Sequence, residues 1–140
     1  KHLVISDRAT ICMPYHKMMD ILEEERLADK KFGSTRRGIA PVYADKYMKK
    51  TVRMGDLLHP ETLREHLNDL VEWKNLTVEK GYGHEPVSAD EMYAWLEKYG
   101  FPFAAASCTS STCPVLLFYV FRRHLYGLYI FSVKHPVFRP

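Results

Sequence analysis

Apolar side chains recur at three- and four-residue intervals between Pro60 and Gly81. This period is typical of a helix with one buried face, and Pro60 suits a first helical position because its missing N–H would have no partner there. We predict a helix that begins at Pro60 and ends before Gly81, with core packing favoured over a partner-binding face. The residues of that face are Leu63, Leu67, Leu70, Val71 and, at its edge, Trp73.

A second amphipathic helix is expected to begin after Pro14 and to end near Ala28. Its charged run at 23–26 is expected to face solvent, since such runs usually lie opposite an apolar stripe. The apolar positions are Tyr15, Met18, Met19 and Leu22.

Ser88 and Glu91 match a capping box, in which the Ser88 hydroxyl accepts from the Glu91 amide and the Glu91 side chain bonds back. The helix that follows is expected to stop at Gly100 in a left-handed conformation. Shorter elements are a buried strand ending at Ser6, a basic helix at 42–50 and an apolar connection at 54–58 with a turn at Gly55.

Acidic residues are distributed unevenly, because every Asp and Glu lies at or before Glu97. Residues 1–100 carry 16 basic and 17 acidic side chains, whereas residues 101–140 carry four basic ones and no acid. We therefore divide the chain into a helical segment, 1–100, and an unrelated, acid-free apolar tail, 101–140. Four scattered cations are too few for a phosphate-tracking stripe, so no nucleic-acid partner is expected.

The tail contains two apolar runs, 115–121 and 125–133, separated by Arg122, Arg123 and His124. Neither run reaches the roughly 20 residues that a membrane helix requires, and the charged break would lie near mid-bilayer. A β-hairpin or irregular structure is favoured, and a membrane partner is not expected. A structural or membrane-associated protein driven by this tail remains an alternative.

The three cysteines, Cys12, Cys108 and Cys113, form neither an even secreted framework nor a zinc-binding spacing. We expect a reducing compartment and no metal site. The first residues lack the features of a signal peptide, so cytoplasmic residence is expected.

One loop carries residue types suited to phosphate binding. Gly33 and Gly38 allow close backbone approach, Thr35 offers a hydroxyl, and N–H groups before the next helix favour an anion. Arg36 and Arg37 are candidate phosphate clamps. The predicted phosphate loop consists of Gly33, Ser34, Thr35, Arg36, Arg37 and Gly38.

Three stretches together resemble the adenylosuccinate synthetase family. Residues 33–46, GSTRRGIAPVYADK, are similar to its signature GTTGRGIGPAYxDK, and residues 53–57, RMGDL, follow at the expected distance. Residues 5–9 and 14–16 resemble the strand-to-helix passage before that loop. The resemblance covers about residues 1–100 and implies a mainly α fragment of an α/β, P-loop NTPase-like enzyme that joins IMP to L-aspartate using GTP, a step of AMP biosynthesis.

The resemblance also implies roles for individual residues. Thr35 matches the threonine that contacts the IMP phosphate, in a loop that orders when IMP binds. Lys49 matches an arginine that reaches across a homodimer to the partner's IMP, but lysine lacks the planar, bidentate guanidinium. Arg36, Ala40 and Thr51 stand where the family has glycine.

The family's GDEGKGK loop, with its general base, and its catalytic acid histidine do not occur in this sequence. The Mg²⁺, GTP and L-aspartate sites are therefore expected to be incomplete, no residue is assigned as catalytic, and the chain alone is expected to be inactive. His16 is expected to be structural, and Asp45 to form an ion pair or a cap. We expect an internal fragment of the ligase, with a tail that results from a reading-frame change or a truncated gene call after about Gly100; a non-enzymatic nucleotide- or phosphate-binding module is the alternative.

Overall fold

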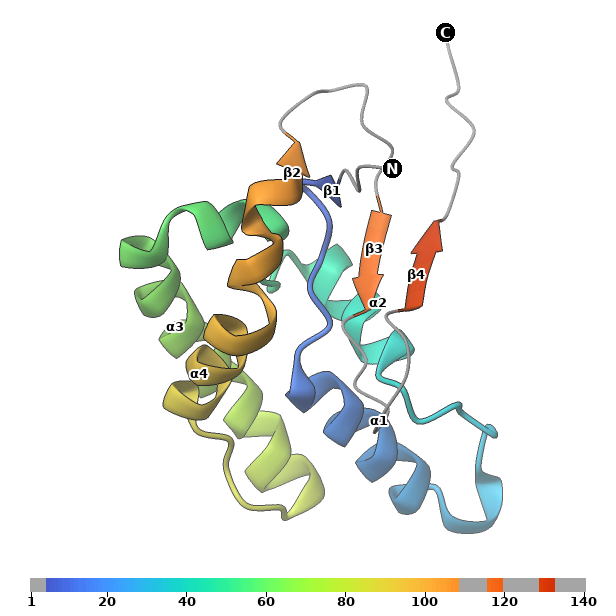
Figure 1. The fold of residues 1–140 in the computed structure, drawn as a ribbon. Coiled ribbons are helices and arrows are strands. Elements are labelled where there is room, and N and C mark those ends of the chain that lie inside the picture. The colour runs from blue at the N-terminus through green and yellow to red at the C-terminus, as the bar shows by residue number, and fades with distance from the viewer. Residues whose placement is uncertain (1–4, 109–115, 120–128, 133–140) are drawn as a thin grey trace, which may run out of the picture.

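The computed structural model describes residues 5–108, 116–119 and 129–132. Four α-helices dominate these residues: α1 (Pro14–Arg26), α2 (Ile39–Met48), α3 (Pro60–Tyr82) and α4 (Ala89–Tyr99). Short 3-10 helices follow three of them: η1 (Ala28–Lys30), η2 (Met54–Leu58) and η3 (Phe101–Ala106). Helix α1 packs against both α2 and α3, while α4 packs against α3 and η3 (Figure 1). The prediction of a mainly helical segment is confirmed.

The described strands are short. β1 (Ile5–Ser6) pairs in parallel with β2 (Ser107–Cys108), with Ile5 opposite Ser107. β3 (Leu116–Tyr119) pairs antiparallel with β4 (Tyr129–Ser132). The connection between β3 and β4 lies outside the described residues, so the hairpin in the tail stays a prediction.

The hydrophobic core lies where α1, α3 and α4 meet residues 5–13 and η2. The predicted face of α3 is buried, with Leu63 and Leu67 each 1% exposed, but Trp73 is 43% exposed and lies beneath the Lys50 ammonium. The other main contributors to this core are Ile5, Ile11, Met13, Tyr15, Met54, Leu57, Met92 and Leu96.

One predicted helix end is wrong, and one predicted cap has a different conformation, although α4 does stop at Gly100 as predicted. Helix α3 continues through Gly81 to Tyr82, because the left-handed C-cap is provided by Gly83 at φ +63°. Gly100 is right-handed at φ −93°, and the chain runs directly into η3. A Cβ at Gly100 would lie 2.9 Å from the Leu96 carbonyl oxygen, so glycine is needed there for close approach.

The other boundaries are near their predicted positions. Helix α1 begins at Pro14 and ends at Arg26, and α2 spans Ile39–Met48 where 42–50 was predicted. Of the predicted capping box, the structure shows the Glu91 amide donating to the Ser88 hydroxyl at 3.4 Å. None of the described helices has the length and apolar character needed to cross a bilayer.

We predict that Leu67→Ala lowers the free energy of unfolding by about 2–5 kcal/mol, because it leaves a cavity in the core. The matched control is Leu76→Ala on the same helix, where the side chain is 47% exposed and the loss should stay below about 1 kcal/mol. Urea unfolding followed by circular dichroism measures both, and equal losses would contradict the assignment of the buried face.

Candidate functional site

The three sequence stretches that resemble one family come together around the segment that leads into α1. Arg53 forms an antiparallel bridge with Thr10, the Met54 amide donates to the Ala9 carbonyl at 2.9 Å, and the Gly55 amide donates to that of Asp7 at 2.8 Å. Gly38 lies against the backbone of the first turns of α1, since a Cβ there would be 2.7 Å from the carbonyl carbon of His16. The stretches therefore form one unit, with α1 at its centre.

Helix α1 buries a row of polar side chains at four-residue spacing. His16, Asp20 and Glu24 are only 0%, 5% and 3% exposed. Glu24 was predicted to face solvent with its charged neighbours, and this prediction is wrong. The reason is that the loop before α2 covers this side of α1 and supplies hydrogen-bond donors to its carboxylates, which removes the cost of burying them.

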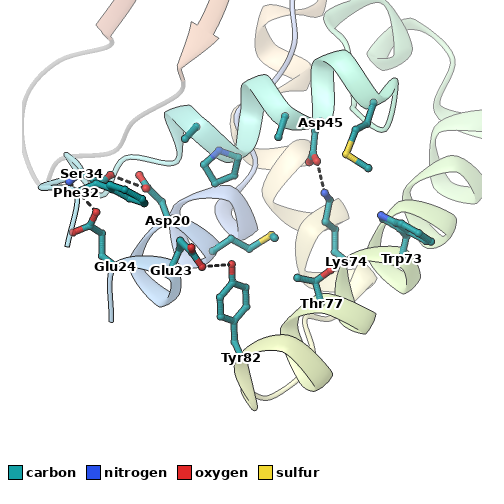
Figure 2. Close-up of a pocket in the computed structure, with 15 residues that line it drawn as sticks. Asp20, Glu23, Glu24, Phe32, Ser34, Asp45, Trp73, Lys74, Thr77 and Tyr82 are labelled. Carbon is teal, nitrogen blue, oxygen red and sulfur yellow. Dashed lines mark hydrogen bonds and ion pairs between the residues drawn. The ribbon is translucent and has the colours of Figure 1, made fainter. Parts of the chain in front are cut away.

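Asp20 and Glu24 bind the loop that contains residues 33–38. The Ser34 hydroxyl donates to Asp20 Oδ1 at 2.6 Å, and the Gly38 amide donates to Asp20 Oδ2 at 2.7 Å. The Ser34 amide donates to Glu24 Oε1 at 3.1 Å (Figure 2). The Arg36 amide donates to the Ser34 hydroxyl at 3.1 Å. The loop is thus fastened to α1 near both of its ends.

These bonds decide which loop groups face outward. The amides of Ser34, Arg36 and Gly38 already donate within the protein. The side chains of Thr35, Arg36 and Arg37 are exposed. Phosphate binding through backbone amides was part of the sequence prediction and stays a prediction. In the structure, the groups of this loop that face solvent are the side chains of residues 35–37.

Positive φ angles occur at three loop residues: Gly33 at +75°, Arg36 at +54° and Gly38 at +81°. Of the three positions at which this chain lacks a glycine expected from the resemblance, Arg36, Ala40 and Thr51, only Arg36 has a positive φ. Ala40 lies within α2, and Thr51 is buried with no positive φ. Arg36 therefore carries left-handed strain of about 1–2 kcal/mol.

A buried trio joins α2 to α1 and α3. His16 Nε2 lies 2.8 Å from Asp45 Oδ2, and the Lys74 ammonium pairs with Asp45 Oδ1. The Met13 amide donates to His16 Nδ1 at 2.9 Å, so the hydrogen is on Nε2 and points to Asp45. Burial lowers the pKa of His16, partly offset by Asp45, and the imidazole is neutral. The expected structural role of His16 and the ion pairing of Asp45 both agree with this geometry.

A cleft of about 610 Å³ lies between α1, α2 and α3 (Figure 2). Three of its carboxylates come from α1 and one, Asp45, comes from α2; the Tyr82 hydroxyl donates to Glu23 Oε2 on the α1 side at 3.1 Å. Phe32, Met48 and Trp73 are exposed beside it. Its remaining lining residues are Met19, Asp20, Glu24, Ser34, Ala40, Pro41, Ala44, Asp45, Lys74 and Thr77.

Two other buried groups have perturbed pKa values. Burial, with a smaller effect of Asp20, raises the pKa of the Cys12 thiol to about 12, so this thiol is unreactive at neutral pH. Burial also raises the pKa of Tyr15, whose hydroxyl has no hydrogen-bond partner among the described residues.

In the part of the chain that the structure describes, no three His, Cys, Asp or Glu side chains are arranged so that they could hold a metal ion. The two buried α1 carboxylates are already occupied by loop donors.

The chain belongs to the adenylosuccinate synthetase family, whose model matches residues 1–113. The enzyme of Dehalococcoides mccartyi is 48% identical over 99 residues, covering 71% of this chain and 23% of that protein. Adenylosuccinate synthetase 2 of Pseudoalteromonas translucida is 43% identical over 108 residues, covering 76% and 26%.

The enzyme of Exiguobacterium sibiricum is 41% identical over 110 residues, covering 79% of this chain and 26% of that protein. This chain spans about a quarter of the length of the curated relatives it matches. The family match extends thirteen residues past Gly100, and the start of an unrelated tail stays a prediction.

The sequence did not identify Asp20 and Glu24 as the residues that hold the loop, or Lys74 as a partner of Asp45. The available signal was the four-residue spacing of His16, Asp20 and Glu24, which places them on one side of a helix. The same spacing is found on ordinary solvated faces, so it does not by itself reveal that a loop covers these residues.

Replacing Gly38 by alanine tests the close contact between the loop and α1. The new methyl would lie 2.7 Å from backbone atoms of His16 and Lys17 at φ +81°, so we expect a loss of about 2–5 kcal/mol in unfolding free energy. Gly83→Ala is the matched control, because φ is +63° but nothing lies within 4 Å. Its loss should be only about 1–2 kcal/mol, and equal losses would show that backbone angle alone matters.

The lowered pKa of His16 predicts a specific pH dependence. The unfolded chain binds a proton at this residue near pH 6.5, whereas the folded chain binds it only at lower pH. Stability from this group is therefore complete above about pH 6.5 and falls below it, by at most about 1.4 kcal/mol per pH unit.

Unfolding free energies between pH 7.5 and 5, compared with those of His16→Gln, isolate this contribution, and His84→Gln is the exposed control. The His16 imidazole resonance in the folded wild-type chain provides a second measurement. A midpoint at or above 6.5 would contradict the prediction.

Proposed function

We propose that residues 33–49 form part of the IMP phosphate pocket of an adenylosuccinate synthetase, the GTP-dependent enzyme that ligates IMP and L-aspartate in AMP biosynthesis. Family membership supports this, since residues 33–46 carry the signature loop. In this proposal the Thr35 hydroxyl donates to the IMP phosphate, and the Arg36 and Arg37 guanidiniums add charge around it.

The observation that carries the proposal is the orientation of the loop. Its backbone is fastened to α1 through Asp20 and Glu24, and the Thr35 side chain stands exposed between the two attachments. A hydroxyl held in this way loses little further conformational entropy when a ligand binds. The exposed guanidinium of Arg36 next to it suits an anionic group rather than a cation.

A second part of the proposal concerns Lys49. This residue ends α2 in a left-handed conformation at φ +59° and is exposed. We propose that its ammonium reaches IMP in the partner subunit of a homodimer. Because an ammonium cannot form the bidentate contact of arginine, the interaction should be weaker and less oriented.

We further propose that the chain alone binds without turnover. The glycine-rich GDEGKGK loop, on which the family forms 6-phosphoryl-IMP, does not occur in the sequence. GTP- and aspartate-dependent consumption of IMP by the purified chain would overturn this part. In this proposal the sites for Mg²⁺, GTP and L-aspartate are incomplete in this chain.

The test is a calorimetric titration of the full 140-residue chain with IMP, and with inosine as the control that lacks the phosphate. We expect saturable binding of IMP, with inosine weaker by at least tenfold. Thr35→Val should weaken IMP binding about five- to twentyfold by removing one hydroxyl donor, whereas Thr35→Ser keeps the donor and should stay near wild type.

Each outcome has a clear meaning. Equal binding of IMP and inosine would mean that the phosphate contributes nothing to affinity, which would contradict the proposal. If Thr35→Val leaves IMP binding unchanged, the phosphate does not bind at the Thr35 hydroxyl, and the proposal fails. Saturable IMP binding without turnover also fits the alternative of a non-enzymatic binding module. Measuring the activity of a full-length relative that carries the same loop substitutions distinguishes the two, because activity there favours the ligase and its loss favours the binding module.

A further inference from the structure

The carboxylate of Asp20 connects the two ends of the signature loop. Its Oδ1 accepts from the Ser34 hydroxyl at 2.6 Å, and its Oδ2 accepts from the Gly38 amide at 2.7 Å. Residues 34 and 38 flank the exposed Thr35, so a single side chain of α1 fixes the chain on both sides of it. Glu24, one turn further along α1, adds a bond to the Ser34 amide only.

Placing an acid beneath a predicted phosphate loop is electrostatically unfavourable for an anion, because like charges repel. Asp20 is 5% exposed, so the carboxylate also loses most of its hydration. Its short hydrogen bonds offset this loss and impose a shape on the loop. Without these bonds, the conformational freedom of Gly33 and Gly38 would leave the loop with many alternative conformations, and nothing would hold Arg36 at its strained positive φ.

We propose that Asp20 is a positioning residue of the signature loop, which holds Ser34 and Gly38 so that the Thr35 side chain is presented to a phosphate. This inference rests on the proposed function, and it deepens it by naming the residue through which the loop acquires its shape. Asp20 touches no ligand in this account and acts through Thr35. The benefit of a fixed loop exceeds the repulsion between the carboxylate and the phosphate.

Two substitutions separate shape from charge. Asp20→Ala removes both acceptors and the charge. Asp20→Asn removes the charge but keeps one acceptor for the Gly38 amide, and its NH₂ group can donate to the Ser34 oxygen. If Asp20 acted mainly by repelling phosphate, both variants would bind IMP more tightly than wild type. If it positions the loop, alanine should be much worse than asparagine.

The experiment follows amide hydrogen exchange in the full chain by NMR, at Gly38 and at Leu70 in the core of α3. Asp20→Ala should speed exchange at Gly38 by about ten- to a hundredfold, as expected for a lost bond to a charged acceptor. Leu70 should change much less, whereas a purely structural role would move both amides together. Asp29→Ala, in the exposed η1, is the matched control and should change neither.

IMP titration of the same variants completes the test. We expect binding to weaken about tenfold or more in Asp20→Ala and by less in Asp20→Asn. Faster exchange at Gly38 with IMP binding as tight as wild type would overturn the inference, as would tighter binding in both variants. If wild type binds no IMP, the proposed function fails, while the exchange rates still decide whether Asp20 holds the loop.

Discussion

Burial of a polar row on α1 is the interaction on which the rest of the arrangement depends. His16, Asp20 and Glu24 lie at four-residue spacing, and each is satisfied by groups from outside α1. His16 hydrogen-bonds Asp45 in α2, whereas Asp20 and Glu24 accept hydrogen bonds from the loop that precedes α2. An unsatisfied buried carboxylate would cost several kcal/mol, so loop and helix must adopt these positions together. The position of α2 follows from both attachments.

The core and the loop differ in how far the sequence determines them. Periodicity predicted the buried face of α3, because Leu63 and Leu67 are buried as apolar side chains and their spacing along the sequence is that of one helix face. The burial of Glu24 was not predictable in this way, since it depends on donors from residue 34, ten positions later in the chain. The end of α3 was placed too early, before Gly81, and Gly100 ends α4 as predicted but without the left-handed angle, because the presence of a glycine does not distinguish a left-handed cap from a close contact.

The motif resemblance predicted more of the site than periodicity did. It identified residues 33–46 and 53–57 as belonging together: residues 53–57 contact the segment that leads into α1, and Gly38 contacts the first turns of α1. It did not indicate Asp20 or Lys74, because neither lies inside the quoted motifs. The groups that fix a loop are often outside the motif that the loop defines, as second-layer contacts are in metal sites.

The neutral trio of His16, Asp45 and Lys74 has a consequence for long-range electrostatics. Its charges cancel within the interior, so it adds little to the field outside the molecule. Any attraction that this region exerts on a distant anion therefore comes from exposed cations such as Arg36 and Lys49. Mobile ions screen such surface charges over about 8 Å at physiological ionic strength but hardly affect buried pairs. Salt should thus weaken the approach of an anion while leaving the scaffold beneath the loop intact.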